Sequence, residues 1–216
     1  YLRSRAAEVH APLSLMLDHG SSFEQCRQAV AWGFTDVMID GSRLPLQENI
    51  DLARKVVEFA HAQGVGVEAE LGHVGDGRTY NEYGARRLGF TDPNVAEQFV
   101  AESGVDVLAV AIGTAHGVYT GEPHLDLDLL AEIAAQVDIP LALHGGTGLT
   151  DEQFRAAIAG GIAKINVATG MFIAAGQAVA ATAQAGERGY FRLVQSAQPA
   201  FQEQCRHYLE LFGKRN

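Results

Sequence analysis

Three histidines in this sequence each stand at the end of a short apolar run, where a buried strand would present a side chain for chemistry. His19, His116 and His144 all follow stretches rich in Val, Ile, Leu and Ala. The carboxyl ends of parallel strands in an α/β barrel meet at one mouth, so matching positions on three strands bring the imidazoles together. Three neutral imidazoles leave a position open on zinc, as in a catalytic site. We therefore predict a zinc site, in preference to three unrelated hydrogen-bonded histidines.

Four acidic residues stand near these histidines. Glu68 and Glu70 are two residues apart in an apolar run, so both point to the same side of a strand. Glu70 is predicted to be a further metal ligand, with a structural ion pair as the alternative. Asp18 precedes His19, and the two share a site only where the backbone turns. A nearby cation would keep Asp18 ionised, although support of a ligating histidine is an alternative role. Asp40 is interpreted equally as a hydrogen-bonding residue or a functional one.

The elements that carry these residues follow a regular alternation. Apolar runs alternate with segments of helical period, which is typical of a parallel sheet covered by helices. Ser21 or Ser22 is a predicted helix cap, and so is Thr150 or Asp151; the Asp92-Pro93 pair opens another helix. The predicted strands are residues 12–18, 36–40, 65–71, 107–112, 140–144 and 163–168, and the predicted helices are residues 22–31, 48–62, 93–103, 126–136, 151–159, 170–185 and 190–212.

This alternation predicts an α/β fold in a single domain, because no linker or change of composition divides the 216 residues. A βα repeat forms either an open doubly wound sheet or a closed (β/α)8 TIM barrel. The barrel is favoured, because candidate ligands recur at strand ends all along the chain. Six strands are two short of closure. We therefore expect strands 3 to 8 of the barrel, with the first two βα units absent and residues 1–10 ending a preceding helix.

Two stretches after the late strands predict a phosphate site. If two strands are missing, these stretches follow the seventh and eighth strands, where phosphate commonly binds in a TIM barrel. Exposed backbone N–H groups are the physical reason. Tight turns use the same residue types, so the position carries the prediction more than the composition does. The predicted residues are Gly145, Gly146 and Thr147 in the first stretch and Asn166, Val167, Ala168 and Thr169 in the second.

The composition excludes several classes of partner. A net charge of −10 argues against a nucleic-acid binder, and no basic run suggests an anionic membrane. No apolar stretch approaches the roughly 18 residues of a membrane span. Cys26 and Cys205 are far apart and form no CxxC motif, so reduced thiols in a cytoplasmic protein are the preferred interpretation.

Residues 72–91 form the one long irregular stretch of the sequence. It contains five glycines together with Arg78, Arg86 and Arg87. A loop of this length inside a compact domain is more often functional than not. We expect it to act as a lid over the site.

The motifs together resemble those of the class II, zinc-dependent ketose-bisphosphate aldolases of the fructose and tagatose type. They span most of the chain and keep the family's order and spacing, so the resemblance is specific. The matching segments are LDHG (17–20), VMIDGS (37–42), VEAELG (67–72), GVDVLAVAIGTAHGVY (104–119), LALHGGTGL (141–149) and GIAKINVATG (161–170).

The resemblance implies roles for individual residues. It makes the three histidines the Zn²⁺ ligands, with Glu70 able to meet the metal and Asp18 as the acid/base. It also implies that Gly117 joins the two predicted phosphate stretches in holding dihydroxyacetone phosphate, beside a monovalent cation such as Na⁺ or K⁺. The family commonly forms homodimers or homotetramers and acts on phosphorylated sugars.

The implied chemistry is reversible cleavage of a phosphorylated ketose. Zinc polarises the ketose carbonyl and stabilises the enediolate left after cleavage. Asp18 takes the C4 hydroxyl proton and returns it in condensation, and Asn166 hydrogen-bonds the substrate near the enediolate. No Schiff base is needed, so Lys164 is interpreted as structural.

The chain departs from the family pattern in the lid. Where the fructose and tagatose enzymes carry an acidic run that protonates the enediolate, this sequence has Arg78, with Asp76 or Glu82 as possible substitutes. We therefore hypothesise a different aldehyde half, a sugar acid or a longer sugar phosphate, met by Arg78, Arg86 or Arg87. Arg188 resembles a family arginine that reaches the substrate of a neighbouring subunit.

Three alternatives stay open at this point. The chain could be a fructose- or tagatose-1,6-bisphosphate aldolase proper. It could be a zinc hydrolase that activates water, although this class does not predict two phosphate loops. It could also be a non-catalytic subunit that keeps its metal for stability, against which the presence of Asp18 and Asn166 argues.

Overall fold

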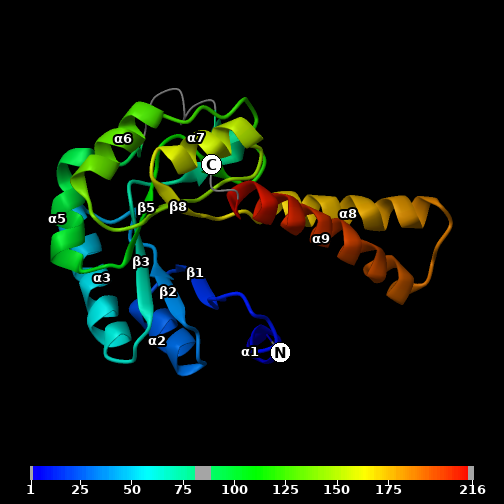
Figure 1. The fold of residues 1–216 in the computed structure, drawn as a ribbon, viewed down its shortest axis with the longest axis horizontal. Coiled ribbons are helices and arrows are strands. Elements are labelled where there is room, and N and C mark those ends of the chain that lie inside the picture. The colour runs from blue at the N-terminus through cyan, green and yellow to red at the C-terminus, as the bar shows by residue number, and fades with distance from the viewer. Residues whose placement is uncertain (1, 81–88, 214–216) are drawn as a thin grey trace.

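A parallel β-sheet covered by helices forms the body of the protein. The computed structural model describes residues 2–80 and 89–213. Figure 1 shows a curved sheet with helices on its outer side and a helical arm that projects from it. The strands are β1 (Met16–Gly20), β2 (Asp36–Ile39), β3 (Gly66–Leu71), β4 (Gly75–Asp76), β5 (Val107–Val110), β6 (Ala115–His116), β7 (Leu141–Leu143) and β8 (Ile162–Ile165), and the helices are α1 (Leu2–Ala6), α2 (Phe23–Ala31), α3 (Leu46–His61), α5 (Pro93–Ser103), α6 (Leu127–Gln136), α7 (Asp151–Ala159), α8 (Thr169–Gln184) and α9 (Tyr190–Gly213).

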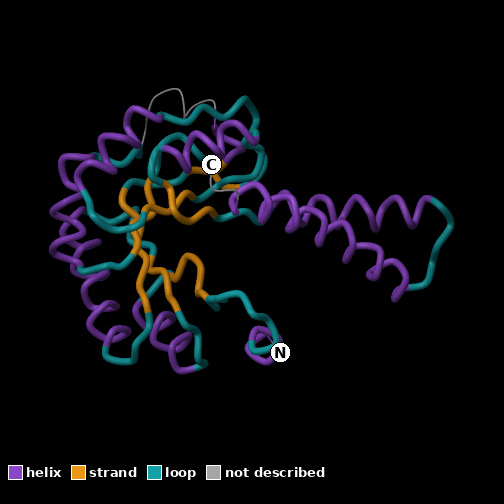
Figure 2. The backbone as a smooth tube through the Cα atoms, in the orientation of Figure 1, coloured by secondary structure: helices purple, strands orange, loops and turns teal. Residues whose placement is uncertain are grey.

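Six of these strands pair into one parallel sheet. Their order is β1-β2-β3-β5-β7-β8, and every neighbouring pair is parallel. The tube in Figure 2 follows this sheet round into a half-barrel, with a helix returning along the outside after most strands. The predicted α/β class with six barrel-type strands is therefore confirmed, and the carboxyl ends of the strands all lie at the same edge.

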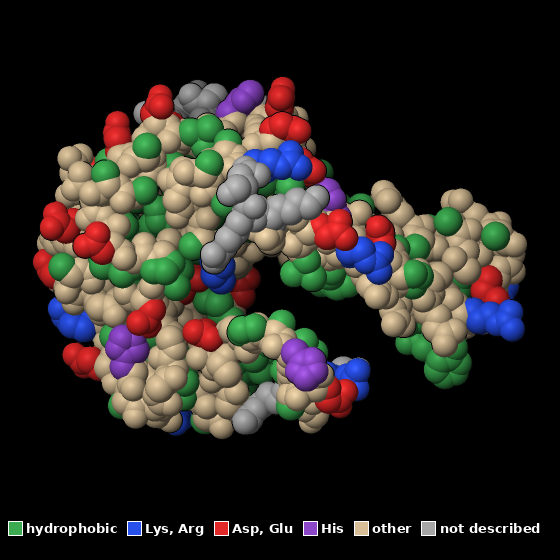
Figure 3. Space-filling model, viewed as in Figure 1, with side chains coloured by type: hydrophobic (Ala, Val, Ile, Leu, Met, Phe, Trp, Pro, Cys, Tyr) green, Lys and Arg blue, Asp and Glu red, His purple; other side chains and the backbone are tan. Residues whose placement is uncertain are grey.

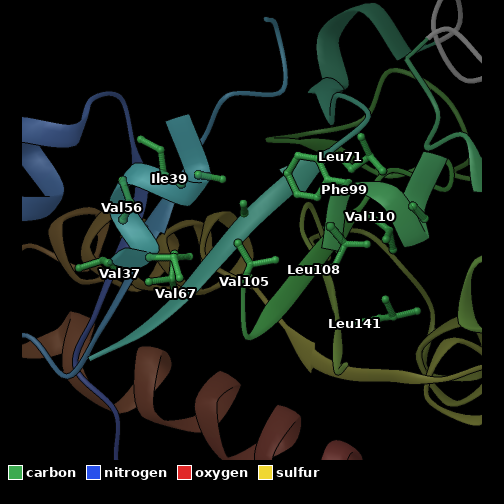
Figure 4. Packing of buried hydrophobic residues seen from close by; sticks show 14 of the residues in the cluster. Val37, Ile39, Val56, Val67, Leu71, Phe99, Val105, Leu108, Val110 and Leu141 are labelled. Atoms are coloured by element: carbon green, nitrogen blue, oxygen red, sulfur yellow. The ribbon is translucent and has the colours of Figure 1, made fainter. Parts of the chain in front are cut away.

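The two faces of the sheet have different side chains. In β3, Val67 and Ala69 belong to the apolar core under the helices. Glu68 and Glu70 alternate with them and are also buried, on the face where Met38 packs in a separate small cluster. Alternation along a strand puts every second residue on the inner face, so this face is free to carry polar chemistry. Figure 4 shows the helix-side core, which includes Val37, Ile39, Val56, Val67, Leu71, Phe99, Val105, Leu108, Val110 and Leu141.

The helices begin where the capping signals predicted. The side chain of Ser22 accepts a hydrogen bond from Gln25 N at the start of α2. Asp92 caps α5, which has proline in its first turn. Thr150 forms a complete capping box with Gln153 at the start of α7. These local bonds satisfy N–H groups that a helix leaves unpaired, so the sequence determines these boundaries closely.

Most predicted strands and helices differ from the observed ones by one or two residues at an end, and three predicted segments differ more. The first strand starts at Met16 rather than residue 12, because residues 14–15 bond to the side chain and backbone of Thr35 before the ladder begins. The strand predicted over 163–168 ends at Ile165, and Ala168 is already the N-cap of α8. The predicted lid is not wholly irregular, because β4 and a 3-10 helix (Gly77–Thr79) occupy part of it and β4 pairs with β6.

The arm consists of helices α8 and α9, which pack along each other and extend away from the barrel (Figure 1). No described residue of α8 is buried. Hydrophobic side chains gather along the arm in Figure 3, and Phe172, Tyr190 and Phe191 are each more than 60% exposed. Within residues 2–80 and 89–213, no helix has both the length and the apolarity needed to cross a membrane.

Candidate metal centre and active site

The end of strand β1 places Asp18 and His19 in one site. His19 has a φ of +47°, the one positive value at a non-glycine position in the described chain, and the β1–β2 pairing shifts register between Leu17 and Gly20. A left-handed residue at an irregular strand end breaks the alternation of side chains. Gly20 is required next to it, because a Cβ there would lie 2.5 Å from the Met38 carbonyl oxygen. Because the backbone turns at His19, the side chains of Asp18 and His19 can reach the same site, which neighbouring residues on a regular strand could not do.

The three predicted histidines meet at the carboxyl ends of their strands. His19 Nε2 lies 3.1 Å from His116 Nε2 and 2.9 Å from His144 Nδ1. Two nitrogens on a tetrahedral zinc with bonds of about 2.0–2.1 Å are about 3.3 Å apart. One nitrogen of each ring lies within 4.8 Å of the other two. The donor set and spacing therefore fit a zinc ion held by three imidazoles.

Two carboxylates orient the imidazoles of His19 and His144 by binding the ring nitrogens that point away from the cluster. Asp40 Oδ2 is 2.9 Å from His19 Nδ1, and Glu68 Oε1 is 2.7 Å from His144 Nε2. When these nitrogens donate their protons to the carboxylates, the opposite nitrogens, His19 Nε2 and His144 Nδ1, carry the free lone pairs. Those are the nitrogens that face each other in the cluster.

The local electrostatics favour a bound cation. Burial opposes ionisation of Asp40 and Glu68, but hydrogen bonds from His19 and Ser42 hold the Asp40 pKa well below its usual range. His144 and then Lys164 likewise lower the pKa of Glu68. Burial, followed by the charges of His19 and His144, lowers the pKa of His116 to about 4. Two ionised carboxylates thus stand behind the cluster while His116 stays a neutral donor at pH 7.

Glu70 lies against the outer side of His19. Its Oε2 is 3.9 Å from His19 Nδ1, and its Oε1 accepts a hydrogen bond from Val74 N at 3.0 Å. Its side chain is 1% exposed. Burial and then the negative charge of Asp40 raise the pKa of Glu70 to about 7. The structure therefore places Glu70 with Asp40 on the Nδ1 side of His19, while the other two histidines face Nε2.

The raised pKa of Glu70 predicts a pH dependence of stability in metal-free protein. The folded-state pKa of about 7 exceeds the ordinary value of 4.5, so unfolding releases a proton between these pH values and stability falls as pH rises through that window. Glu70→Gln has no proton to release. Between pH 5 and pH 7.5 we expect the variant to lose about 2 kcal/mol less unfolding free energy than wild type, measured by urea titration. Glu58→Gln on the exposed face of α3 should follow wild type; parallel curves for Glu70→Gln and wild type would contradict the prediction.

A polar chain links Asp18 to the buried carboxylate behind His144. Asp18 Oδ1 accepts a hydrogen bond from Asn166 Nδ2 at 3.0 Å. Asn166 Oδ1 accepts one from Lys164 Nζ at 2.6 Å, and Lys164 Nζ is 3.0 Å from Glu68 Oε2. Asp18 Oδ1 also lies 4.0 Å from His19 Nε2 and 3.9 Å from His144 Nδ1. The predicted Asp18 and Asn166 therefore reach the open side of the histidine cluster together.

The two predicted phosphate stretches lie side by side. Gly146 N donates to the Asn166 carbonyl oxygen at 3.2 Å, and Thr147 Oγ1 accepts from Gly170 N at 3.1 Å. Gly145 has a φ of +73° and would place a Cβ 2.4 Å from the Ala115 oxygen, so glycine is required there. Residues 166–169 lead directly into the 16-residue helix α8, whose N-terminal N–H groups favour an anion.

The last predicted contacts are spread over the chain. Gly117 follows His116 with a φ of +88° and open space at its α-carbon. Arg78 is 83% exposed and forms an ion pair with Asp76. Arg188 lies in the turn between α8 and α9 and donates to the Ala183 carbonyl oxygen, at the far end of the arm (Figure 1). Glu82, Arg86 and Arg87 lie outside the described residues.

Three roles in the site were missed or undervalued from the sequence. Asp40 is the partner of His19, and its position at a strand end was the available signal. Glu68 is the partner of His144, for which the i, i+2 spacing to Glu70 was the signal. Lys164 connects Glu68 to Asn166, and its place two residues before Asn166, at the end of β8, could have indicated this.

Comparison with known proteins now identifies the family. A family model described as fructose-bisphosphate aldolase class-II matches residues 1–216. The chain belongs to this family. Among class II aldolases, the chain is 46% identical over 171 residues to the fructose-bisphosphate aldolases of Staphylococcus epidermidis and Staphylococcus aureus. The match covers 79% of this chain and 59% of those relatives, so it spans about three fifths of their length. The family predicted from the motifs is confirmed.

Solved structures support the same grouping. The YdjI aldolase from Escherichia coli K12 superposes with a TM-score of 0.85 at 36% identity, covering 97% of this chain and 73% of that one. A putative fructose-1,6-bisphosphate aldolase from Coccidioides immitis has a TM-score of 0.85 at 30% identity, covering 97% and 74%. The fructose-bisphosphate aldolase of Campylobacter jejuni, at 21% identity and a TM-score of 0.73, shares the fold. The class II family implies a divalent metal, for which the three histidines are the candidate ligands.

Proposed function

We propose that this chain carries the active site of a metal-dependent aldolase that reversibly cleaves a phosphorylated ketose into dihydroxyacetone phosphate and an aldehyde. The observation that carries the proposal is the position of Asp18, whose carboxylate lies within 4.0 Å of ring nitrogens of both His19 and His144. A base at this distance from a metal centre can reach a hydroxyl group on a metal-bound substrate. Membership of the class II family supports the same reaction.

The residues of the chain have distinct parts in this reaction. His19, His116 and His144 hold Zn²⁺, which when bound supplies a Lewis acid for the ketose carbonyl. Asp18 accepts the C4 hydroxyl proton during cleavage and returns it during condensation. Asn166 is fixed by Lys164 and Asp18, so its amide stays oriented toward the reacting carbons without reorganisation.

The phosphate of the dihydroxyacetone half binds, in this proposal, to the paired stretches that follow β7 and β8. Gly146 N and Asn166 N donate within the fold, so the other backbone N–H groups of residues 145–147 and 166–169 and the N-terminus of α8 supply the positive potential. Gly117 joins this part of the site in the proposal, and a monovalent cation beside the phosphate completes the charge balance. The fructose- or tagatose-1,6-bisphosphate reaction and cleavage of a ketose phosphate with a sugar-acid end both fit this half of the site.

A panel of ketose phosphates tests the proposal. The full-length protein is loaded with zinc and incubated with each substrate, with and without a chelator, while release of dihydroxyacetone phosphate is followed. Release that the chelator abolishes and zinc restores is the expected result. Bound zinc with no release from any ketose phosphate would contradict it, and would favour a hydrolase or a subunit that keeps metal for stability.

We also propose a homodimer or homotetramer, supported by the exposed apolar side chains of the arm and tested by light scattering.

A further inference from the structure

One arginine beside the metal centre has no part in the reaction described above. Arg43 lies in the turn between β2 and α3 and lines a cavity of about 330 Å³ together with His19, Asp40, His73 and His116. It is exposed to solvent. The cavity therefore joins a permanent positive charge to two of the candidate zinc ligands.

The turn that carries Arg43 is held in place. Asp40 Oδ1 accepts hydrogen bonds from Ser42 N at 3.1 Å and from Ser42 Oγ at 2.7 Å. A Cβ on Gly41 would lie 2.2 Å from Asn49 Oδ1, so the backbone is packed closely against α3 at this point. Because Asp40 also binds His19, the same carboxylate holds both a candidate zinc ligand and the turn that carries Arg43.

The charge of Arg43 is not neutralised within residues 2–80 and 89–213, where it forms no hydrogen bond or ion pair. Arg78 is instead engaged by both carboxylate oxygens of Asp76. Burial and then the positive charge of Arg43 lower the pKa of His73, so the field of this guanidinium reaches the cavity. An unpaired guanidinium suits planar, bidentate recognition of an anion.

The strand order puts Arg43 on the opposite flank from the phosphate stretches. Those stretches follow β7 and β8, at one end of the order β1-β2-β3-β5-β7-β8. Arg43 follows β2, near the other end and next to the strand that carries His19, whereas His144 directly precedes the first phosphate stretch. The histidine cluster therefore borders both regions. A ketose phosphate that places its phosphate at 145–147 and its carbonyl at the metal therefore extends the rest of its chain toward Arg43.

We propose that Arg43 binds an anionic group, a carboxylate or a phosphate, at the far end of the aldehyde half of the substrate and so determines which ketose phosphates are cleaved. This inference rests on the proposed aldolase function. It reassigns to Arg43 the contact that the sequence alone suggested for Arg78, Arg86 or Arg87, because Arg78 is already paired and Arg43 lies in the cavity; Arg86 and Arg87 lie outside the described residues.

The first test compares three ketose 1-phosphates of equal length that end in a hydroxymethyl, a carboxylate or a phosphate group. In zinc-loaded protein we expect Arg43→Met to lower kcat/KM about 10- to 100-fold for one or both anionic substrates, with the neutral substrate changed less than about 2-fold. Arg43→Lys should recover part of the loss, and Arg78→Met is the matched control with no selective effect. Comparing the two anionic substrates identifies whether a carboxylate or a phosphate is bound.

Three results of this test would overturn the proposal. An equal loss on neutral and anionic substrates would mean that Arg43 supports the fold or the metal ligands, and a selective loss in Arg78→Met instead would move the contact to the lid. No change in Arg43→Met on any substrate would also refute it.

A binding measurement keeps this inference separate from the proposed function. Saturation-transfer NMR compares a sugar acid with the matching neutral sugar alcohol on wild type and on Arg43→Met, each with and without zinc. If wild type cleaves no ketose phosphate, the aldolase proposal fails, but a preference for the sugar acid that disappears in Arg43→Met still supports the anion site. Equal binding of the two ligands to wild type would overturn the site itself.

Discussion

Replacing Asp18 by asparagine should lower kcat for ketose phosphate cleavage about 10³-fold and leave zinc bound. General acid–base groups contribute roughly 10²- to 10⁴-fold, and an amide cannot accept the C4 hydroxyl proton. Asp18 is not one of the clustered donors, because its Oδ1 stays 4.0 Å from His19 Nε2 and 3.9 Å from His144 Nδ1. Its side chain is 57% exposed, so the substitution should leave the fold unchanged.

Steady-state kinetics and the zinc content of the same preparation check this prediction. Asp51→Asn is the matched control, because the Asp51 side chain is 51% exposed on α3, where it pairs with Arg54. We expect this control to keep wild-type kcat. If Asp18→Asn lost its zinc, Asp18 would instead be needed to hold the metal, and a change in kcat of less than about tenfold would exclude it as the proton acceptor.

Glu68→Gln should produce the largest combined loss of stability and metal affinity. The carboxylate is 1% exposed and binds both His144 Nε2 and Lys164 Nζ, so its removal leaves a partly buried lysine without its counter-charge. Breaking a buried pair costs about 3 kcal/mol. Because the orienting partner of His144 is also weakened, zinc affinity should fall about 10- to 100-fold.

Two measurements separate these effects. Urea titration of the metal-free protein gives the unfolding free energy, and competition with a chromogenic chelator gives the zinc affinity. Glu132→Gln, on the exposed face of α6, should change neither. A zinc affinity equal to that of wild type in Glu68→Gln would show that Glu68 serves only the ion pair with Lys164.

The elements that hold the site were predictable because their signals are local. Caps at Ser22, Asp92 and Thr150 bond to N–H groups two or three residues away, so the sequence around them is sufficient. The buried strands were predicted equally well, since both faces of a parallel sheet are covered or filled. Boundaries failed at Met16 and Ile165, where bonds to distant residues decide which positions pair.

The sequence by itself determined the α/β alternation, the family and the three histidines, because residue types and spacing along one chain specify them. Only the tertiary structure decided which nitrogen of each ring faces the others, because Asp40 and Glu68 come from different strands than the histidines they orient. The left-handed backbone at His19 and the lack of a partner for Arg43 within residues 2–80 and 89–213 are likewise consequences of packing. Contacts between residues 21, 76 or 148 positions apart depend on the curvature of the sheet, which no local pattern encodes.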